Sequence, residues 1–403
     1  MKPQLDHDYK FGVVLFDDPR PEGGWACVAG GKPDRIRSIG DLASDTRWWT
    51  NLTYPDFSQY IGMKTPMFKK AEYLRTSLPN LAAEIGMVDR LATRAVAAQV
   101  LSKIFDRVMR LAHKNYGIGG ADRDGKRLAE LTLADELYKV IISPDRSISP
   151  EIDKAAELAW ENGARCINGL RRNAGVYTRF MRSRIMNAME VVSTPVPSAQ
   201  WEFLPDDKLP PAKRRIEWLL SLGQPILART TVSKVRPEYQ AVLPIGGSRN
   251  NSRGWMTHPE LLLMARMSDV RVEGAFIASR YESLEPRIRL DVGGQVGPLS
   301  ISHGLLAECY VAALTMGHYR GGHSDRLFAP RAAWLAAAER FHCFLAAGLM
   351  SNNGFSVAYY GQGSVHVMVP DGALKDACDV AANAGLLPPL TVASDIATKM
   401  AHA

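Results

Sequence analysis

The stretch VDRLATRAVAAQVLSKIFDRVMRLA (88–112) carries an apolar side chain at every third or fourth position. An α-helix has 3.6 residues per turn, so this spacing places the apolar side chains on one face and predicts an amphipathic helix. The helix is expected to end near Gly117, because glycine favours the left-handed conformation found after many helix ends. Helices are therefore expected to supply much of the fold.

The sequence on either side of this helix combines further helical and strand patterns. Helices are expected over 126–142, from Pro150 to about Gly163, and over 170–192, 212–221, 304–315 and 330–348. Strands are expected over 11–16, 25–29, 239–243, 270–273 and 287–292, and a hairpin over 355–369 turning at Gly361–Ser364. The predicted fold class is α+β, predominantly helical, with small antiparallel sheets or hairpins near the N-terminus and in the C-terminal half.

A chain of 403 residues is longer than a single hydrophobic core usually supports, which favours more than one domain. The segment 193–211 contains five prolines, and such a density argues against regular structure. We therefore predict a helix-rich domain with a short hairpin over 1–192, a proline-rich linker over 193–211, and an α+β domain over 212–403.

Composition restricts the class of protein. No stretch approaches the roughly 18 apolar residues that a membrane span requires, and the first residues lack an apolar signal segment, so no membrane partner is expected. The five cysteines are scattered and form no CxxC pair, which is typical of a reducing compartment. The expected location is the cytoplasm or the inside of an assembled particle.

Positive charge is concentrated in the middle of the chain. Residues 165–253 hold fifteen Lys and Arg against six Asp and Glu, a net +9, whereas the rest of the chain carries a net −2. Polyanions are bound largely by Lys and Arg that neutralise phosphates, and the planar arginine side chain suits phosphate geometry. This stretch is therefore a candidate surface for nucleic acid, although a solvated or internally paired basic surface has the same composition.

The candidate nucleic-acid-binding residues fall on three predicted elements. One face of the helix expected over 170–192, a cluster opening the helix over 212–221, and a Gly/Asn-rich loop supply Arg171, Arg172, Arg179, Arg182, Lys213, Arg214, Arg215, Arg249 and Arg253. Aromatic residues in the same stretch that could stack on bases are Tyr177, Trp218, Tyr239 and Trp255. The helix over 88–112 extends the surface with Arg90, Arg94, Arg107, Arg110 and Lys114.

Catalytic motifs with fixed spacing are missing from the sequence: it has no GxxxxGK[ST], GxGxxG, HExxH or GxSxG pattern. The residues with the most reactive side chains gather in one region, namely His303, Cys309, His318, His323, Asp325, His342 and Cys343. Their spacing matches no familiar metal site, and a surface loop with a buried Cys343 is the simpler interpretation. No catalytic residue, metal or cofactor is assigned.

These observations favour a non-enzymatic protein that binds nucleic acid, RNA rather than DNA, and assembles with copies of itself. A viral capsid protein, a nucleoprotein or a backbone subunit of a ribonucleoprotein complex would fit. One alternative is an enzyme, a hydrolase or a metal-dependent enzyme, with a site around His318 and His323. Another is a protein-interaction scaffold.

Overall fold

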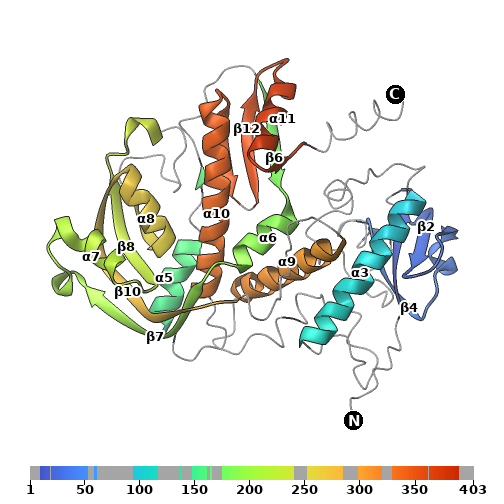
Figure 1. Cartoon of the computed structure of the whole chain (residues 1–403), viewed down its shortest axis with the longest axis horizontal. Helices are drawn as coiled ribbons and strands as arrows, with labels where there is room; N and C mark the ends of the chain where they lie inside the picture. The colour runs from blue at the N-terminus through green and yellow to red at the C-terminus, as the bar shows by residue number, and fades with distance from the viewer. Residues whose placement is uncertain are drawn as a thin grey trace, which may run out of the picture. The chain divides into compact units, whose positions relative to one another are not determined.

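A computed structural model of the chain describes residues 10–18, 20–52, 59–60, 94–116, 137, 148–160, 164–165, 175–239, 252–284, 298–319, 329–361 and 363–389. The chain separates into two compact units by its internal contacts. Unit 1 is drawn from 1–143, 287–313 and 390–403, and unit 2 from 144–286 and 314–389. Figure 1 shows the helices and strands of the chain and labels those for which there is room.

Unit 1 contains a four-stranded sheet in the order β3-β2-β1-β4. The strands are β1 (Lys10–Phe16), β2 (Glu22–Val28), β3 (Asp34–Ser38) and β4 (Thr46–Thr50). β1 and β2 pair antiparallel, which confirms the predicted N-terminal hairpin, while β4 lies parallel to β1.

Helix α3 (Arg94–Tyr116) packs against β1 and β2. Its predicted apolar stripe is confirmed from residue 94 onward, since Ala98, Leu101, Phe105, Val108 and Ala112 are each at most 1% exposed. The ring of Trp49 from β4 stacks on Phe105 with ring centroids 4.5 Å apart. Residues 88–93 of the predicted helix lie outside the described residues.

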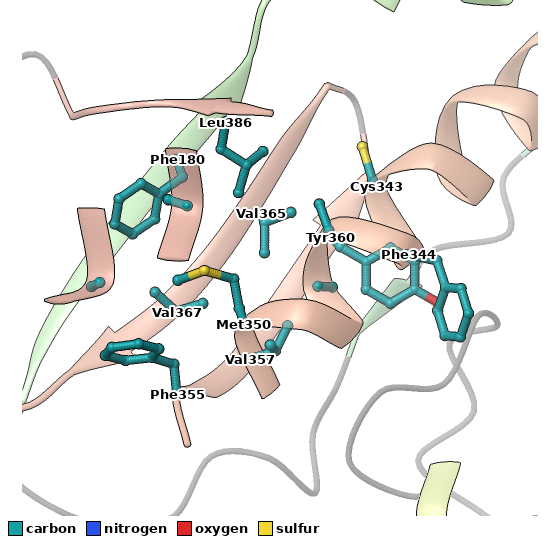
Figure 2. Close-up of a cluster of buried hydrophobic side chains, with 14 of the residues drawn as sticks. Phe180, Cys343, Phe344, Met350, Phe355, Val357, Tyr360, Val365, Val367 and Leu386 are labelled. Carbon is teal, nitrogen blue, oxygen red and sulfur yellow. The ribbon is translucent and has the colours of Figure 1, made fainter. Parts of the chain in front are cut away.

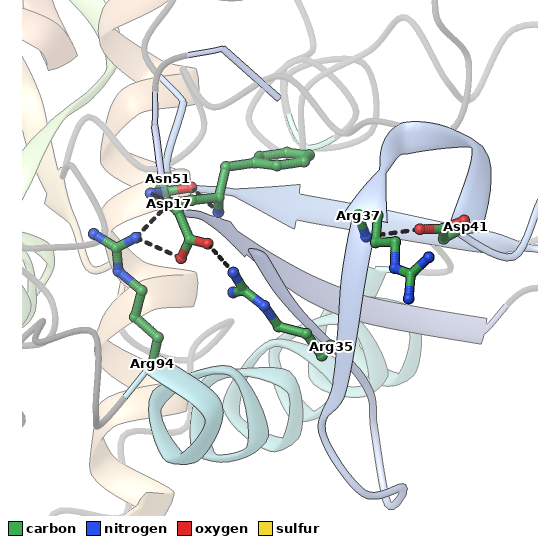
Figure 3. Close-up of polar contacts among 7 residues, drawn as sticks. Asp17, Arg35, Arg37, Asp41, Asn51 and Arg94 are labelled. Carbon is green, nitrogen blue, oxygen red and sulfur yellow. Dashed lines mark hydrogen bonds and ion pairs between the residues drawn. The ribbon is translucent and has the colours of Figure 1, made fainter. Parts of the chain in front are cut away.

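Polar side chains of Asp17, Arg35, Arg94 and Asn51 form a hydrogen-bonded cluster at the end of β1 (Figure 3). Asp17 forms ion pairs with Arg35 and with Arg94, whose Nη1 also donates to the Phe16 carbonyl at 3.0 Å. The side chain of Asn51 exchanges two hydrogen bonds of 2.9 Å with the backbone of Phe16. The hydrogen bond from Arg35 is the main reason that the pKa of Asp17 is lowered. The cluster joins β1, β3 and α3 to the segment after β4.

Gly12 in β1 leaves room for an aromatic ring, and this gives a first prediction. A Cβ at Gly12 would lie 2.5 Å from Cζ3 of Trp48, so Gly12→Ala should lower the free energy of unfolding by about 1–3 kcal/mol through overpacking. Gly348 in α10 has no atom within 4 Å of a Cβ position, and Gly348→Ala should instead raise it by about 0.5–1 kcal/mol. Urea unfolding of both variants measures the difference, and equal effects would contradict it.

Unit 2 contains a second four-stranded sheet, ordered β7-β10-β8-β9. These strands are β7 (Val196–Pro205), β8 (Ile226–Ser233), β9 (Ser252–Thr257) and β10 (Asp269–Glu282). Helices α7 (Arg215–Ser221) and α8 (His258–Met267) contribute Leu219 and Leu261 to a core that includes Ile226 and Ala275 of this sheet. The predicted helix over 212–221 and the strand over 270–273 are confirmed.

The expectation of irregular structure over 193–211 is wrong for ten of its residues. β7 pairs antiparallel with β10 along its length, with Pro205 opposite Gly274 and Pro197 opposite Tyr281. β7 is an edge strand, and a strand edge tolerates proline because one row of its N–H groups needs no partner. The division of the chain into domains at 193–211 stays a prediction.

A five-stranded sheet, ordered β13-β6-β12-β11-β5, is the other sheet of unit 2. Its strands are β5 (Ala164–Arg165), β6 (Val176–Arg182), β11 (Ser356–Gly361), β12 (Ser364–Val369) and β13 (Leu386–Leu387). Helices α10 (Ala329–Asn352) and α11 (Leu374–Asn383) supply Met350, Cys343 and Ala377 to its core (Figure 2). The antiparallel β11–β12 pair confirms the predicted hairpin.

The helix predicted over 170–192 is wrong in its described first half. Residues 176–182 form β6, in which Thr178 and Phe180 are buried while Tyr177 and Arg179 are exposed. The helix begins only after Ser183, whose side chain accepts a hydrogen bond from Met186 N, and α6 covers Arg184–Val192. Pairing of β6 with β12, nearly 190 residues later in the chain, overrides the local helical spacing.

The remaining predicted elements have mixed outcomes. The helices expected from Pro150, over 304–315 and over 330–348 lie in α5 (Pro150–Trp160), α9 (Pro298–Tyr319) and α10. Of the strand predicted over 239–243, only Tyr239 is described, and it belongs to a short 3-10 turn. The helix predicted over 126–142, except for Leu137, and the strand predicted over 287–292 lie outside the described residues. Helices and three sheets share the described residues, so the fold is α+β without a strong helical predominance.

A buried ion pair connects three helices of unit 2. Arg340 of α10 donates from Nε and Nη2 to Oε1 of Glu260 at 3.0 and 2.6 Å, and these side chains are 9% and 5% exposed. The other donors of Arg340 reach the carbonyls of Ala159 and Trp160 at the end of α5. Oε2 of Glu260 accepts from both N and Oγ1 of Thr257, the residue that caps α8. Both charges are thus extensively hydrogen bonded.

Removal of one partner should expose the cost of burying the other. Arg340→Met should lower the free energy of unfolding by about 3–5 kcal/mol, because Glu260 would remain buried without its counter-ion. As a control, Arg331→Met removes a more exposed pair with Glu282 and should cost no more than about 1 kcal/mol. Urea titration followed by tryptophan fluorescence tests this, and similar losses in the two variants would refute it.

Candidate functional site

The five-stranded sheet has one face committed to the hydrophobic core and one that carries polar and aromatic side chains. Phe180, Val365 and Val367 point into the core with Phe344 and Met350 of α10 (Figure 2). Because side chains alternate along a strand, the residues between them lie on the other face. We call this the open face, defined by Tyr177, Arg179, Tyr359, Ser364 and His366.

Strand register brings these residues together. Arg179 of β6 lies opposite His366 of β12, which in turn lies opposite Tyr359 of β11. Directly opposed residues of antiparallel strands share a face and are close neighbours. Three strands therefore contribute a cation, an imidazole and a phenol to adjacent positions in one row across the sheet.

His366 is held by a hydroxyl group on each side. Its Nδ1 is hydrogen bonded to the hydroxyl of Tyr177, and its Nε2 lies 3.1 Å from Oγ of Ser364. The rings of Tyr177 and Tyr359 meet the imidazole edge-on, with centroids 5.4 and 5.0 Å away. Both ring nitrogens are thus engaged, which fixes the orientation of the imidazole.

The surroundings of His366 and Tyr359 keep both side chains uncharged. Burial, followed by the charge of Arg179, lowers the pKa of His366 to about 4, so the imidazole is neutral at neutral pH. Burial, followed by the negative charge of Glu339, raises the pKa of Tyr359, so its hydroxyl stays protonated. Arg179 is consequently the charged group of the open face.

Tyr177 and Arg179 are the open-face residues most accessible to a ligand. Tyr177 is 55% exposed and Arg179 is also exposed. Among the residues that the structure describes, none forms an ion pair with Arg179. An exposed aromatic ring beside an uncompensated guanidinium can stack on a planar group and bind an anion at the same time.

The predicted arginine surface on residues 171–182 is divided by the fold. Arg179 lies on the open face, whereas Arg182 points to the opposite side, where it pairs with Glu190 and donates to Oδ1 of Asn187 at 2.6 Å. Adjacent strand positions alternate between faces, so residues three apart cannot share one. Arg171 and Arg172 lie outside the described residues.

The second predicted cluster is divided as well. Lys213 and Arg214 are exposed, but Arg215 is only 9% exposed and pairs with Asp206. Its Nε donates to the Pro210 carbonyl at 2.7 Å and its Nη1 to the Val272 carbonyl at 2.8 Å. Arg215 is therefore a structural residue, and its inclusion among the nucleic-acid contacts is not supported.

The third predicted cluster and the histidine site involve side chains outside the described part of the chain, including Arg249, Arg253, His318 and His323. Cys343 is buried, as expected, and burial raises the pKa of its thiol to about 12. In the described part of the chain no three His, Cys, Asp or Glu side chains gather in a way that could hold a metal ion. No helix there has the length and apolar character needed to cross a membrane.

Sequence reasoning identified Tyr177 and Arg179 but missed Tyr359, Ser364 and His366. The hairpin over 355–369 was predicted, but regular alternation along it places Tyr359 on the same side as the buried Val357. A register shift between Val357 and Tyr359 turns Tyr359 to the open face. The missing information was the partner strand, because Tyr177 and His366 are 189 residues apart. Of the predicted stacking residues, Trp218 and Tyr239 instead pack against the hydrophobic cores.

Comparison with known proteins gives matches to structures alone. No family model and no curated protein sequence matches the chain. Among solved structures it is similar to Phi29 DNA polymerase complexed with primer-template DNA, with 11% identity, a TM-score of 0.48, and coverage of 91% of this chain and 82% of that one. The same polymerase complexed with single-stranded DNA matches with 12% identity, a TM-score of 0.47 and the same coverage.

These matches correct the function expected from the sequence. The similar structures are of an enzyme, not of a capsid, virion or nucleoprotein component, so the expectation of a non-enzymatic structural protein is wrong. The physical basis of that expectation also weakens, because Arg182 and Arg215 are internally paired. At TM-scores below 0.5 the likeness assigns no activity, substrate or partner to this chain.

The charge of Arg179 gives a prediction for its neighbour. Arg179→Gln should raise the pKa of His366 above its value of about 4, because a repelling positive charge is lost, but not as far as 6.5, since burial remains the larger cause. Histidine NMR titration measures this shift. Arg229→Gln, on the other sheet of unit 2, is the control and should leave the His366 pKa unchanged; an equal shift in both variants would contradict the assignment.

Proposed function

We propose that this chain binds single-stranded nucleic acid on the open face of the five-stranded sheet. The observation that carries the proposal is the exposed pair Tyr177 and Arg179 on one face of β6. Aromatic side chains on an exposed sheet surface are a recurrent platform for unpaired bases, whose flat faces stack on the rings. The proposal concerns binding and leaves out any structural role in a particle.

Tyr177 is suited to stacking because its position is already restricted. Its hydroxyl is bonded to His366, yet 55% of the residue remains exposed. A base that stacks on the phenol ring would meet an uncharged neighbour, since the pKa of His366 lies near 4. Stacking of this kind tolerates any base, so the open face should show little sequence preference.

Arg179 supplies the complementary charge. It lies two residues from Tyr177 on the same face, so the Cα atoms of the two residues are about 7 Å apart along the strand. A nucleotide whose base stacks on Tyr177 has its phosphate within reach of such a side chain. The proposal includes a preference for RNA over DNA and self-association of the chain.

Oligonucleotide binding tests the proposed function. Tyr177→Ala should weaken binding of single-stranded 20-mers by about 5- to 150-fold, the range found for loss of one stacking ring. Fluorescence anisotropy with RNA and DNA 20-mers measures this loss and the RNA preference, and light scattering of the free chain measures self-association.

The matched control is Phe203→Ala, which removes an aromatic residue of similar exposure, 48%, from the other sheet of unit 2. It should retain binding. If Tyr177→Ala binds as tightly as the unaltered chain, or if both variants lose the same affinity, the open face is not the binding surface.

A further inference from the structure

Helix α3 of unit 1 presents a row of positive side chains away from its sheet. Lys103, Arg107, Arg110 and Lys114 are all exposed. At 100° per residue they fall within about 60° of one another around the helix, and they extend over about 16 Å of its length. We call these four residues the α3 basic row.

The row keeps most of its charge. Arg110 pairs with Asp106 at 2.7 Å, but among the described residues no ion pair involves Lys103, Arg107 or Lys114. Arg94, which sequence reasoning had grouped with this surface, points elsewhere, because it binds Asp17 and the Phe16 carbonyl. Lys103, which sequence reasoning omitted, takes its place.

We propose that the α3 basic row binds the phosphate backbone of nucleic acid. The spacing of its cations, one helical turn or about 5–6 Å apart, is close to the distance between successive phosphates of an extended strand. Contacts of this kind position a nucleic acid without reading its bases. The inference rests on the proposed function for the class of ligand, which is nucleic acid. The residues that carry it belong to unit 1, whereas the open face belongs to unit 2.

The opposite side of α3 argues against a membrane surface as the partner. A helix that binds a bilayer inserts its apolar face between the lipids. In α3 that face is occupied, because Leu101, Phe105 and Val108 are each 1% exposed against the sheet of unit 1. The row therefore offers charge without a free apolar surface, which suits a soluble polyanion.

The salt dependence of binding tests the proposal. The triple variant Lys103→Gln, Arg107→Gln and Lys114→Gln keeps good helix formers at exposed positions and leaves the Arg110 ion pair intact. Each phosphate contact to a single strand contributes about 0.7 to the slope of log affinity against log salt concentration, so the slope should fall by about 2. Binding of duplex DNA should weaken as well, because phosphate contacts need no unpaired bases.

The matched control removes the same charge elsewhere. Lys32, Arg37 and Lys375 are exposed cations outside α3, and their triple glutamine variant should retain the slope. If both triple variants lose the slope equally, net charge alone is responsible and the row is not a site. If the row variant loses binding to phosphatidylserine vesicles while oligonucleotide binding is unchanged, the partner is a membrane and the proposal is wrong.

A measurement on the unaltered chain removes any dependence on folding of the variants. Oligonucleotide should protect the amino groups of Lys103 and Lys114 from acetylation, measured by mass spectrometry, and should leave Lys375 reactive. Equal reactivity with and without oligonucleotide would overturn the proposal.

The two proposals can fail separately. If the row variant weakens single- and double-stranded probes while Tyr177→Ala changes neither, the row stands and the open face is wrong. If Tyr177→Ala weakens single strands and the row variant changes nothing, the row is wrong and the open face stands.

Discussion

The buried contact between Arg340 and Glu260 is the constraint on which the arrangement of unit 2 depends. Burial of two charges is unfavourable unless their donors and acceptors form hydrogen bonds. Here the carbonyls at the end of α5 accept from the remaining donors of Arg340, and the N–H of Thr257 donates to the second carboxylate oxygen of Glu260. α10 is thereby fixed against α5 and α8 while its Phe344 and Met350 complete the core of the five-stranded sheet. With that face committed to the core, Tyr177, Arg179 and His366 lie on the other face of the sheet.

Local periodicity predicted the elements that one segment can specify alone. The helix α3 and the β11–β12 hairpin show a clear 3.6- or two-residue repeat, and both are present. The four-residue spacing of Tyr177, Met181 and Ile185 favours a helix over the residues of β6, although the chain changes from strand to helix at Ser183. That change depends on β12, a distant segment which no local window contains.

The net charge of the basic stretch over 165–253 does not show how many of its cations are free to bind a partner. Glu190 and Asp206, two of the six acidic residues within the stretch, are the partners of Arg182 and Arg215. A net charge cannot show which cations are used internally, whereas burial and hydrogen bonding can. Arg179 is left on a surface whose other members, such as His366, contribute little to a charge count.

The hydrogen bond between Tyr177 and His366 has a consequence for the entropy of binding. An exposed side chain normally samples several rotamers, and a partner that orders it must offset about 0.5–1.5 kcal/mol. His366 is itself positioned through Ser364, so the tyrosine ring is restrained before any partner arrives. Part of the side-chain entropy of Tyr177 is thus lost during folding rather than on binding. The same contact with a partner therefore gives a more favourable free energy of binding than it would for a freely rotating ring.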